Sequence, residues 1–307
     1  MPNKPLFSII MPTHERGEVF WQSLSAANAA IEGMDAEIIV VNDSKKSKII
    51  LRESMPQVTV VDNPKSGVAS ARNYGAILAN ADLLFFVDDD MLINKKAVLY
   101  TLELYKDNYE RCYNSDWVYP PELDEKIAKT QFGRYLTRYG FTTMRGWNLG
   151  VEWNTEKAFE VDIVMSNFLP IYKSSFNKIK GYNEDFPHSG AEDHDFAKRL
   201  KKSGIIAMID PKLIVYHNEA DRTIMEDWLN RKIRSGQTRK MAVDLGYVET
   251  IIVHNKLKSA IYLTVIKTKF IFKFILKLIP NIKAFDPIYF KFVNLLLAAS
   301  LYEGYRR

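Results

Sequence analysis

Short apolar runs alternate with longer amphipathic stretches over the first hundred residues of the chain. The apolar runs are six or seven residues long and rich in Val, Ile and Phe, which is typical of buried strands. The stretches between them have the spacing of helices with one buried face. The pattern predicts strands at Leu6–Met11, Ala36–Asn42, Gln57–Asp62 and Asp82–Val87, and helices at Glu18–Ile31, Lys45–Met55 and Val68–Ala79.

Strands that alternate with helices in this way indicate a parallel sheet, because parallel neighbours need a long crossover connection. Right-handed crossovers place the carboxyl ends of the strands along one edge, where open α/β sheets bind ligands. Three of the four predicted strand ends carry carboxylates: Glu15 follows the first strand, Asp43 the second, and Asp88, Asp89 and Asp90 the fourth. We therefore expect one polar site at this edge of the sheet.

Regular patterns are weaker after residue 105. Aromatic and charged residues dominate 105–154, and regular signals return from Phe159 onward. Beyond Asp221 every regular segment is helical, so the sequence predicts a mixed α/β domain followed by a helical extension. The elements expected here are strands at Phe159–Met165, Ile205–Ile209 and Leu213–His217, and helices at Leu123–Tyr139, Glu192–Ser203, Ile224–Leu245, Lys256–Ile279 and Pro287–Tyr302.

The charge of the 307-residue chain is unevenly distributed. Its net charge is +5, but residues 251–307 carry ten Lys and Arg against two acidic residues, a net +8, which leaves −3 for the first 250 residues. A mildly acidic body argues against nucleic-acid binding, because basic residues would then line the working groove. The single cysteine, Cys112, and an amino terminus without a signal-peptide pattern predict a cytosolic, reducing setting.

Asp88, Asp89 and Asp90 end the apolar run Leu83–Val87. Adjacent carboxylates repel one another, so their position at the end of a buried strand costs stability unless a cation or hydrogen-bond donors offset it. Mg²⁺ and Mn²⁺ take oxygen ligands from one or two carboxylates and from substrate phosphates. The pattern favours a metal–diphosphate site at Asp88 and Asp90 over a solvated acidic loop that caps a helix at Asn94.

A second group of charged residues opens the predicted helix at Glu192–Ser203. Ser189 and Glu192 have the spacing of a capping box, so a structural and a functional interpretation of Glu192 both remain open. Asp195 and Arg199 are four residues apart, as in a helix-surface ion pair. Asp193 fits neither structural pattern, and the helix dipole favours its ionised form, which can accept a proton. Asp193 is therefore the candidate general base.

Three further groups have open interpretations. His217 closes a predicted strand and is either a hydrogen-bonded structural residue or a nitrogen ligand of the metal ion. The basic segment with Arg234 and Arg239 is either a solvated helix face or a phosphate contact. The aromatics of 105–154 are mostly core by expectation, but some can form a platform for an acceptor sugar. The candidates for that platform are Trp117, Trp147 and Trp153.

An ordered series of motifs over roughly residues 5–220 resembles the family 2 glycosyltransferases of the GT-A fold. The series is Pro12-Thr13, Val40–Asp43, Gly67–Gly75, Phe86–Asp90, Gly181–Glu184, Glu192-Asp193 and Arg199-Leu200. The resemblance implies a GT-A-like α/β fold with a mixed, mainly parallel sheet. It places a catalytic domain at 1–222, with a nucleotide-sugar half at 1–104 and an acceptor half at 105–222, before the helical extension at 223–307.

The resemblance also implies an activity and roles for single residues. The activity is inverting, metal-dependent transfer of a sugar from a nucleotide sugar, a UDP-sugar, to a hydroxyl of a glycan or lipid-linked acceptor, as in bacterial surface polysaccharide assembly. The metal ion is Mn²⁺ or Mg²⁺. The implied roles are nucleotide-sugar binding for Pro12, Thr13, Asp43 and Arg72, metal binding for Asp88, Asp90 and His217, and the general base for Asp193. We also expect Asp89 to bind the nucleotide sugar and Glu192 to bind the acceptor.

Two other functions compete with this expectation. A catalytically silent sugar-nucleotide or glycan-binding protein does not need the acidic residues Asp88, Asp90 and Asp193, which are all present. A sugar nucleotidylyltransferase is expected to have a Gly-rich phosphate loop after the first strand, where this chain has Pro12–Arg16. The sequence favours the transferase over both.

The basic tail predicts attachment to a membrane surface. Lys269, Lys273 and Lys277 recur every four residues in a helix otherwise made of Ile, Phe and Leu, as in interfacial helices with lysines towards anionic headgroups. The uncharged stretch Phe292–Tyr302 is shorter than the ~20 residues of a spanning helix. We expect residues 251–307 to bind the cytosolic face of a membrane, and the alternative is packing on the catalytic domain or on a second subunit.

Overall fold

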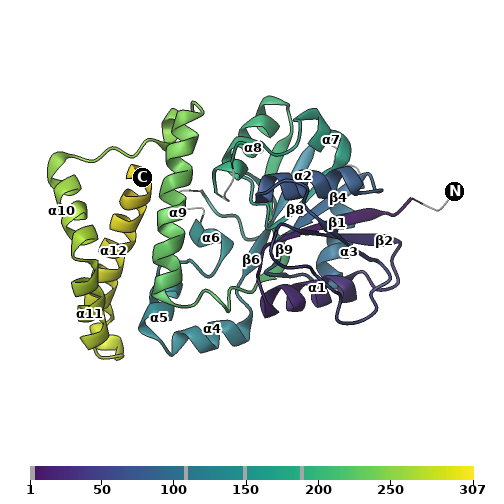
Figure 1. Cartoon of the computed structure of the whole chain (residues 1–307). Coiled ribbons are helices and arrows are strands. Elements are labelled where there is room, and N and C mark those ends of the chain that lie inside the picture. The colour runs from purple at the N-terminus through teal and green to yellow at the C-terminus, as the bar shows by residue number, and fades with distance from the viewer. Residues whose placement is uncertain (1–3, 107–109, 148–150, 187–189) are drawn as a thin grey trace. The chain divides into compact units, whose positions relative to one another are not determined.

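The computed structural model describes residues 4–106, 110–147, 151–186 and 190–307. These residues form two compact units (Figure 1). The first unit comprises described residues of 1–120, 143–187 and 192–219, and the second those of 121–142, 188–191 and 220–307. The second unit takes 121–142, which the sequence assigned to the acceptor half, together with 220–307. The expected division into a catalytic domain at 1–222 and an extension at 223–307 stays a prediction.

The main sheet of the first unit has five strands in the order β3-β2-β1-β4-β8. Four strands are parallel and β8 is antiparallel to β4. Strands β1 and β4 are buried along their whole length, as expected for central strands with continuous apolar runs. The bounds are β1 Phe7–Thr13, β2 Ala36–Asn42, β3 Val58–Asp62, β4 Leu83–Val87 and β8 Phe168–Tyr172.

Helices α1 (Glu18–Ala30) and α2 (Val68–Leu78) are the crossovers of this sheet. Helix α2 lies so close to the sheet that a Cβ atom on Gly75 would be 2.4 Å from Cγ2 of Ile10 on β1. Only glycine fits this position without movement of a neighbour. The contact fixes the start of α2 beside the carboxyl ends of β1 and β4.

A second sheet, in the order β5-β9-β6, completes the first unit, and β7 pairs with β9. Strand β9 joins the two strands expected at 205–209 and 213–217. It continues through Pro211 because the pairing register of β6 shifts between Ser115 and Asp116. The bounds are β5 Met91–Leu92, β6 Arg111–Val118, β7 Phe159–Glu160 and β9 Ile206–His217.

Four more helices belong to the first unit: α3 (Lys95–Leu104), α6 (Met144–Trp147), α7 (Lys173–Lys178) and α8 (Ala191–Lys202). The side chain of Asn94 caps α3 by accepting a hydrogen bond from the Ala97 amide at 2.9 Å. The acidic segment Asp88–Asp90 therefore does precede a helix capped by Asn94, as the interpretation of this segment as a solvated acidic loop required. Ser189, the expected partner of a capping box at α8, lies outside the described residues.

Two sequence predictions in the first unit are wrong. The described residues Lys45–Met55 form no helix, because side chains capture the backbone there: Ser44 Oγ accepts from the amides of Lys46 and Ser47, and Asn42 donates to the Ser47 carbonyl. The strand expected at Phe159–Met165 is only two residues long.

The second unit is helical, as the sequence predicts for the tail. The helical segment expected at Leu123–Tyr139 is divided before α5, where Thr130 accepts a capping hydrogen bond from the Gly133 amide. The helix expected at Lys256–Ile279 is divided at Thr268. The bounds are α4 Pro121–Ala128, α5 Gln131–Arg138, α9 Met225–Asp244, η1 Val248–Thr250, α10 Lys256–Lys267, α11 Lys269–Leu278, η2 Lys283–Phe285 and α12 Asp286–Arg306.

Helix α12 forms the core of the second unit with α9. A Cβ atom on Gly304 of α12 would be 1.9 Å from the Ile233 carbonyl oxygen, and one on Gly236 of α9 would be 2.2 Å from the Leu301 carbonyl oxygen. The segment Lys283–Arg306 is long and apolar enough to cross a membrane by length and composition alone, and 39% of its most apolar window is buried inside the structure.

Candidate active site

Asp88, Asp89 and Asp90 follow β4, and their side chains have three different partners. Asp88 Oδ1 accepts a hydrogen bond from Arg72 Nη2 at 2.8 Å, and Asp89 Oδ2 accepts one from Thr13 Oγ1 at 2.6 Å. Asp90 Oδ2 accepts one from Arg16 Nη2 at 2.6 Å. Burial raises the pKa of Asp88, and it raises that of Asp89 to about 7, where the Asp90 charge adds to the effect. Thr13 and Arg16, at and after the end of β1, thus contact two of the three carboxylates that follow β4.

Arg72 of α2 connects this acidic group to the start of α8. Its side chain is 3% exposed, and Nη1 lies 3.2 Å from Glu192 Oε1. Burial by itself would lower the pKa of Arg72, but the charges of Asp88, Asp193 and Glu192 raise it, so the guanidinium stays charged. Glu192 is 1% exposed. Its carboxylate therefore supports Arg72 from inside the protein and does not offer an open surface to an acceptor.

Asp193 is held by Ser166 and Tyr182. Ser166 Oγ donates to Asp193 Oδ1, the Ser166 amide lies 3.4 Å from Oδ2, and the Tyr182 hydroxyl lies 2.6 Å from Ser166 Oγ. Burial raises the pKa of Asp193, while Arg72 and the Ser166 hydrogen bond lower it. From the sequence we expected the helix dipole to favour the ionised form of Asp193. In the structure burial has the larger effect and raises the pKa of this carboxyl group. A raised pKa suits a base that works near neutral pH.

Pro12, Thr13 and Asp43 lie at the carboxyl ends of β1 and β2. Asp43 accepts hydrogen bonds from the Gly67 amide, at 3.0 Å to each oxygen, and from Asn63 Nδ2 at 2.7 Å. Gly67 has φ 102°, a conformation that favours glycine, and immediately precedes α2. Asp43 therefore fixes the turn into α2. The nucleotide contacts expected for these three residues stay predictions.

His217 ends β9 and faces two carboxylates. Its Nε2 lies 3.3 Å from Asp90 Oδ1 and 3.8 Å from Glu219 Oε1, and all three residues are buried. One ligand atom from each lies within 4.8 Å of those of the other two, so the group could hold a metal ion. Glu219 was not among the predicted site residues, and its only sequence signal is its position two residues after His217 in the same polar segment. Asp88, which was also expected to bind the metal, pairs with Arg72 instead in this structure.

The three candidate acceptor tryptophans differ in position. Trp117 of β6 is 2% exposed, with its ring 4.7 Å from and nearly perpendicular to the His217 ring, so the expectation of an open sugar platform is wrong for it. Trp147 is half-buried. Trp153 is also half-buried and packs against Phe159 and under the Arg145 guanidinium. Acceptor contacts by Trp147 and Trp153 stay predictions.

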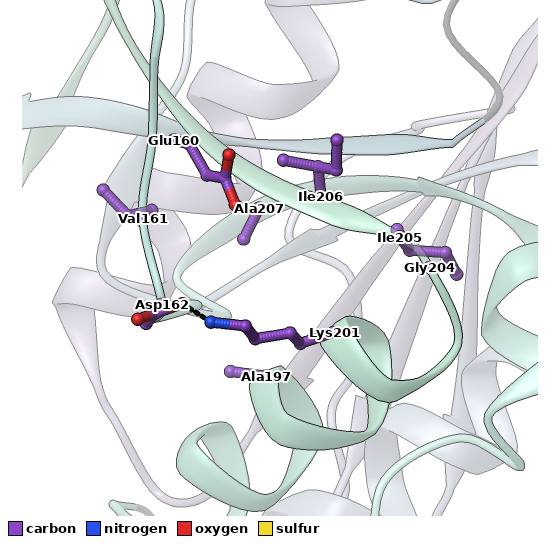
Figure 2. A pocket seen from close by; sticks show the side chains of 9 residues that line it. All are labelled: Glu160, Val161, Asp162, Ala197, Lys201, Gly204, Ile205, Ile206 and Ala207. Carbon is purple, nitrogen blue, oxygen red and sulfur yellow. Dashed lines mark hydrogen bonds and ion pairs between the residues drawn. The ribbon is translucent and has the colours of Figure 1, made fainter.

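A separate pocket of about 170 Å³ lies between β7, α8 and β9 (Figure 2). Its lining residues include the exposed ion pair Lys201–Asp162, at 2.6 Å, and none of the candidate site residues. Arg234 and Arg239 lie on α9 of the second unit, and both are exposed. The phosphate contact expected for them stays a prediction.

Comparison with protein families gives two matches. The model of "Glycosyl transferase family 2" matches residues 8–168, just over half of the chain, and that of "N-terminal domain of galactosyltransferase" matches residues 159–218. The chain belongs to glycosyl transferase family 2. The second match covers α8 and the strand that ends in His217, so the two matches together contain Asp88–Asp90, Asp193 and His217, while Glu219 lies one residue beyond them.

Curated relatives are glycosyltransferases of greater length. Validoxylamine A glucosyltransferase of Streptomyces hygroscopicus subsp. limoneus is 26% identical over 66% of this chain and 49% of its own length. Poly(ribitol-phosphate) beta-N-acetylglucosaminyltransferase TarP of Staphylococcus aureus is 31% identical over 36% of this chain and 35% of its own length. Chondroitin synthase of Pasteurella multocida is 24% identical over 69% of this chain and 24% of its own length. The family 2 chain thus spans about half or less of the relatives it matches.

Solved structures agree with this family on the fold. S. aureus TarS 1–349 is similar with a TM-score of 0.52 and 14% identity, over 98% of this chain and 89% of that one. GalNAc-T7, crystallised with UDP, GalNAc and Mn²⁺, has a TM-score of 0.52 and 12% identity, over 79% of this chain and 52% of that one. The GT-A fold and the family predicted from the sequence are both confirmed.

Proposed function

We propose that this chain is an inverting glycosyltransferase that moves a sugar from a UDP-sugar to a hydroxyl of a glycan or lipid-linked acceptor, as in bacterial surface polysaccharide assembly. The observation that carries the proposal is the buried Arg72, which pairs with Asp88 and Glu192 and lies close enough to Asp193 for their charges to interact. Family membership supports it, and so do relatives named for glucosyl and N-acetylglucosaminyl transfer. UDP as the nucleotide is supported by its presence in GalNAc-T7.

In the proposed reaction Asp193 is the general base. The acceptor hydroxyl gives its proton to a carboxylate oxygen of Asp193 while the hydroxyl oxygen attacks the anomeric carbon of the donor sugar. The bond from that carbon to the diphosphate oxygen breaks, and the electron pair leaves with the nucleoside diphosphate. Attack from the face opposite the leaving group inverts the anomeric configuration. Ser166 holds Asp193 in one orientation and stabilises its ionised form.

A divalent cation, Mn²⁺ or Mg²⁺, fits the site because Asp90 Oδ1 and His217 Nε2, 3.3 Å apart, offer a carboxylate and an imidazole in a buried position. When bound, the cation would neutralise negative charge on the departing diphosphate. Asp89 and Thr13, which are hydrogen-bonded to each other, lie at the same sheet edge as this group. Asp88 positions Arg72, whose charge also favours an anionic ligand.

We further propose that the chain attaches peripherally to the cytosolic face of an anionic membrane. The contact is made by the apolar face of α11 and not by the face with Lys269 and Lys273 that the sequence suggested. Lys273 pairs with Glu226 at 2.6 Å and Lys269 lies 3.9 Å from Glu303, so these lysines face other helices of the second unit. The most exposed apolar side chains of α11 are those of Phe270 (71%), Phe274 (60%) and Leu278 (65%). Exposed lysines adjoin them at Lys267 and Lys277.

The exposed residues of α11 suit a lipid surface for two reasons. Phe270, Phe274 and Leu278 are spaced by four residues and therefore share one face of the helix. Apolar side chains beside lysines match the boundary between acyl chains and anionic headgroups, where each lysine contributes about 1 kcal/mol. A second protein subunit is the other surface that could cover this face.

Flotation with liposomes tests the membrane proposal. The full chain is expected to float with phosphatidylserine-containing vesicles at low salt, and the double change Phe270→Ser and Phe274→Ser is expected to abolish flotation. The matched control, Ile50→Ser, removes an apolar side chain that is 81% exposed in the first unit and should leave flotation unchanged. A wild-type chain that stays at the bottom and sediments as an oligomer would assign the face to protein packing.

The transfer reaction is tested first by ligand binding and then by turnover. A thermal-shift screen of nucleotide sugars with Mn²⁺ should raise the melting temperature for the donor, since a ligand that binds only the folded state stabilises it. The donor found in this way should then be consumed with release of UDP, slowly by water and faster with an acceptor. A donor that binds but is never consumed would instead support a catalytically silent binding protein.

A further inference from the structure

Asp90, His217 and Glu219 form a compact group in the first unit. Their exposed fractions are 5%, 7% and 0%, and one ligand atom from each lies within 4.8 Å of those of the other two. His217 Nε2 is 3.3 Å from Asp90 Oδ1 and 3.8 Å from Glu219 Oε1. Neither the sequence motifs nor the family matches assign a role to Glu219.

The backbone fixes Glu219 beside Asp90. Strand β5 pairs antiparallel with β9 so that Met91 lies opposite His217. The next residue, Asn218, donates its amide to the Asp90 carbonyl at 2.7 Å, and its side chain donates to Gln22 Oε1 at 2.7 Å. The segment that carries Glu219 is therefore bound on both sides to elements next to the acidic group, and it has little freedom to move away.

Tyr119 fixes the orientation of the Glu219 carboxylate. The Tyr119 hydroxyl donates to Glu219 Oε2 at 2.6 Å, and both side chains are buried. This hydrogen bond turns the other oxygen, Oε1, towards His217 Nε2. The Trp117 ring meets the His217 ring at 83° with centroids 4.7 Å apart, which restrains the imidazole plane. Contacts of this kind orient metal ligands in proteins, and their loss typically weakens metal binding about 10- to 100-fold.

The charges of the group also favour a cation. Two buried carboxylates close together are costly unless positive charge offsets them. Arg16 donates to Asp90 Oδ2 at 2.6 Å and offsets one of the charges. A divalent cation between the three ligand atoms would offset the other charge.

We infer that Glu219 is a ligand of the divalent cation together with Asp90 and His217, and that Tyr119 is its positioning residue. The inference rests on the proposed function in one respect, since the cation is taken to serve the nucleotide-sugar diphosphate. An imidazole among the ligands favours a transition metal such as Mn²⁺ over Mg²⁺, which prefers oxygen ligands. The metal shell thereby reaches beyond the Asp88–Asp90 motif to the segment after β9.

Isothermal titration of the full chain with Mn²⁺ alone tests this inference. Glu219→Gln keeps the size of the side chain but loses the charge, and it is expected to raise the Kd of Mn²⁺ at least tenfold. Tyr119→Phe removes only the positioning hydroxyl and should raise the Kd by about tenfold. Glu160→Gln, at an exposed glutamate of β7, is the matched control and should leave the Kd unchanged. Melting temperatures without metal show whether each variant is folded.

Two results would overturn the inference. One is an unchanged Kd in folded Glu219→Gln and Tyr119→Phe proteins while Asp90→Asn loses Mn²⁺, which would make Glu219 purely structural. The other is a wild-type chain that binds no Mn²⁺, with or without UDP. A different result would refute the proposed function alone. If Mn²⁺ binding depends on Glu219 but the chain neither binds nor consumes any nucleotide sugar, Glu219 remains a metal ligand and the chain is not a glycosyltransferase.

Discussion

Arg72→Met is expected to destabilise the first unit strongly, and more at high pH than at low pH. Arg72 donates to Asp88 at 2.8 Å and to Glu192 at 3.2 Å, and the side chains of Arg72 and Glu192 are 3% and 1% exposed. Methionine fills much of the same space without a charge. It leaves two carboxylates, one of them fully buried, without their cation, and removal of one partner from a buried ion pair typically costs about 3–5 kcal/mol.

The pH dependence follows from the carboxylates that remain. Burial already raises the pKa of Asp88 in the folded protein, in spite of the lowering effect of Arg72. Without Arg72 this pKa rises further above the unfolded-state value of about 3.9, so the folded variant binds protons more tightly than the unfolded chain. The free energy of unfolding of the variant therefore falls as the pH rises from about 4 through the folded-state pKa. The loss relative to wild type is smaller at pH 5 than at pH 8.

Urea unfolding in metal-free buffer at pH 5 and pH 8, followed by tryptophan fluorescence, measures this loss, because four of the five tryptophans lie in the first unit. The matched control is Arg52→Met, at an exposed arginine that pairs with Glu18 at 2.9 Å. It should cost less than about 1 kcal/mol at both pH values, as exposed ion pairs do. A loss for Arg72→Met as small as that of the control, or one equal at both pH values, would refute the reasoning.

Three further expectations concern single residues. Ser166→Ala removes a hydrogen bond that lowers the pKa of Asp193, so the acid limb of the kcat/KM profile should move up by about one pH unit, the equivalent of about 1.5 kcal/mol; a profile that does not move would exclude the positioning role. Asp90→Ala should remove the dependence of UDP affinity on Mn²⁺, and calorimetry that finds the dependence intact would place the metal elsewhere. Gly304→Ala should lower the stability of the second unit by about 1–3 kcal/mol, because its Cβ would overlap the Ile233 carbonyl; an unchanged urea midpoint would speak against this close contact.

Three parallel strands of the main sheet could be predicted because β1, β2 and β4 are continuous or nearly continuous apolar runs. Strand β6 was not predicted, since Arg111–Val118 mixes aromatic and polar residues and buries both faces, including Asn114 and Ser115. The helix expected at Lys45–Met55 failed for a local reason, the capture of backbone groups by Asn42 and Ser44. Such side-chain hydrogen bonds compete with helix formation and leave no periodic signal.

Residue type and strand-end position were enough to find part of the candidate site. Asp88–Asp90, Asp193 and His217 carry distinctive chemistry, and the structure brings them to one edge of the first unit. Glu219 and Ser166 escaped notice because their importance depends on tertiary contacts, with Tyr119 a hundred residues away and with Asp193 twenty-seven residues away.

The faces of α11 escaped the sequence analysis for the same reason. Spacing showed that Lys269 and Lys273 share one side of the helix, but not which side packs inwards. Their partners Glu303 and Glu226 lie on α12 and α9, and these carboxylates draw the lysines into the second unit and leave Phe270 exposed.

The most direct test of the proposed reaction is the rate of UDP release from the UDP-sugar donor by Asp193→Asn, with Mn²⁺ and acceptor present. The amide keeps the shape of the side chain but cannot take the acceptor proton. The rate should therefore fall about 10²–10⁴-fold, while calorimetry in the same buffer gives an unchanged Kd for UDP. Near wild-type turnover by a folded Asp193→Asn protein would contradict the assignment of Asp193 as the base and, with it, the proposed mechanism.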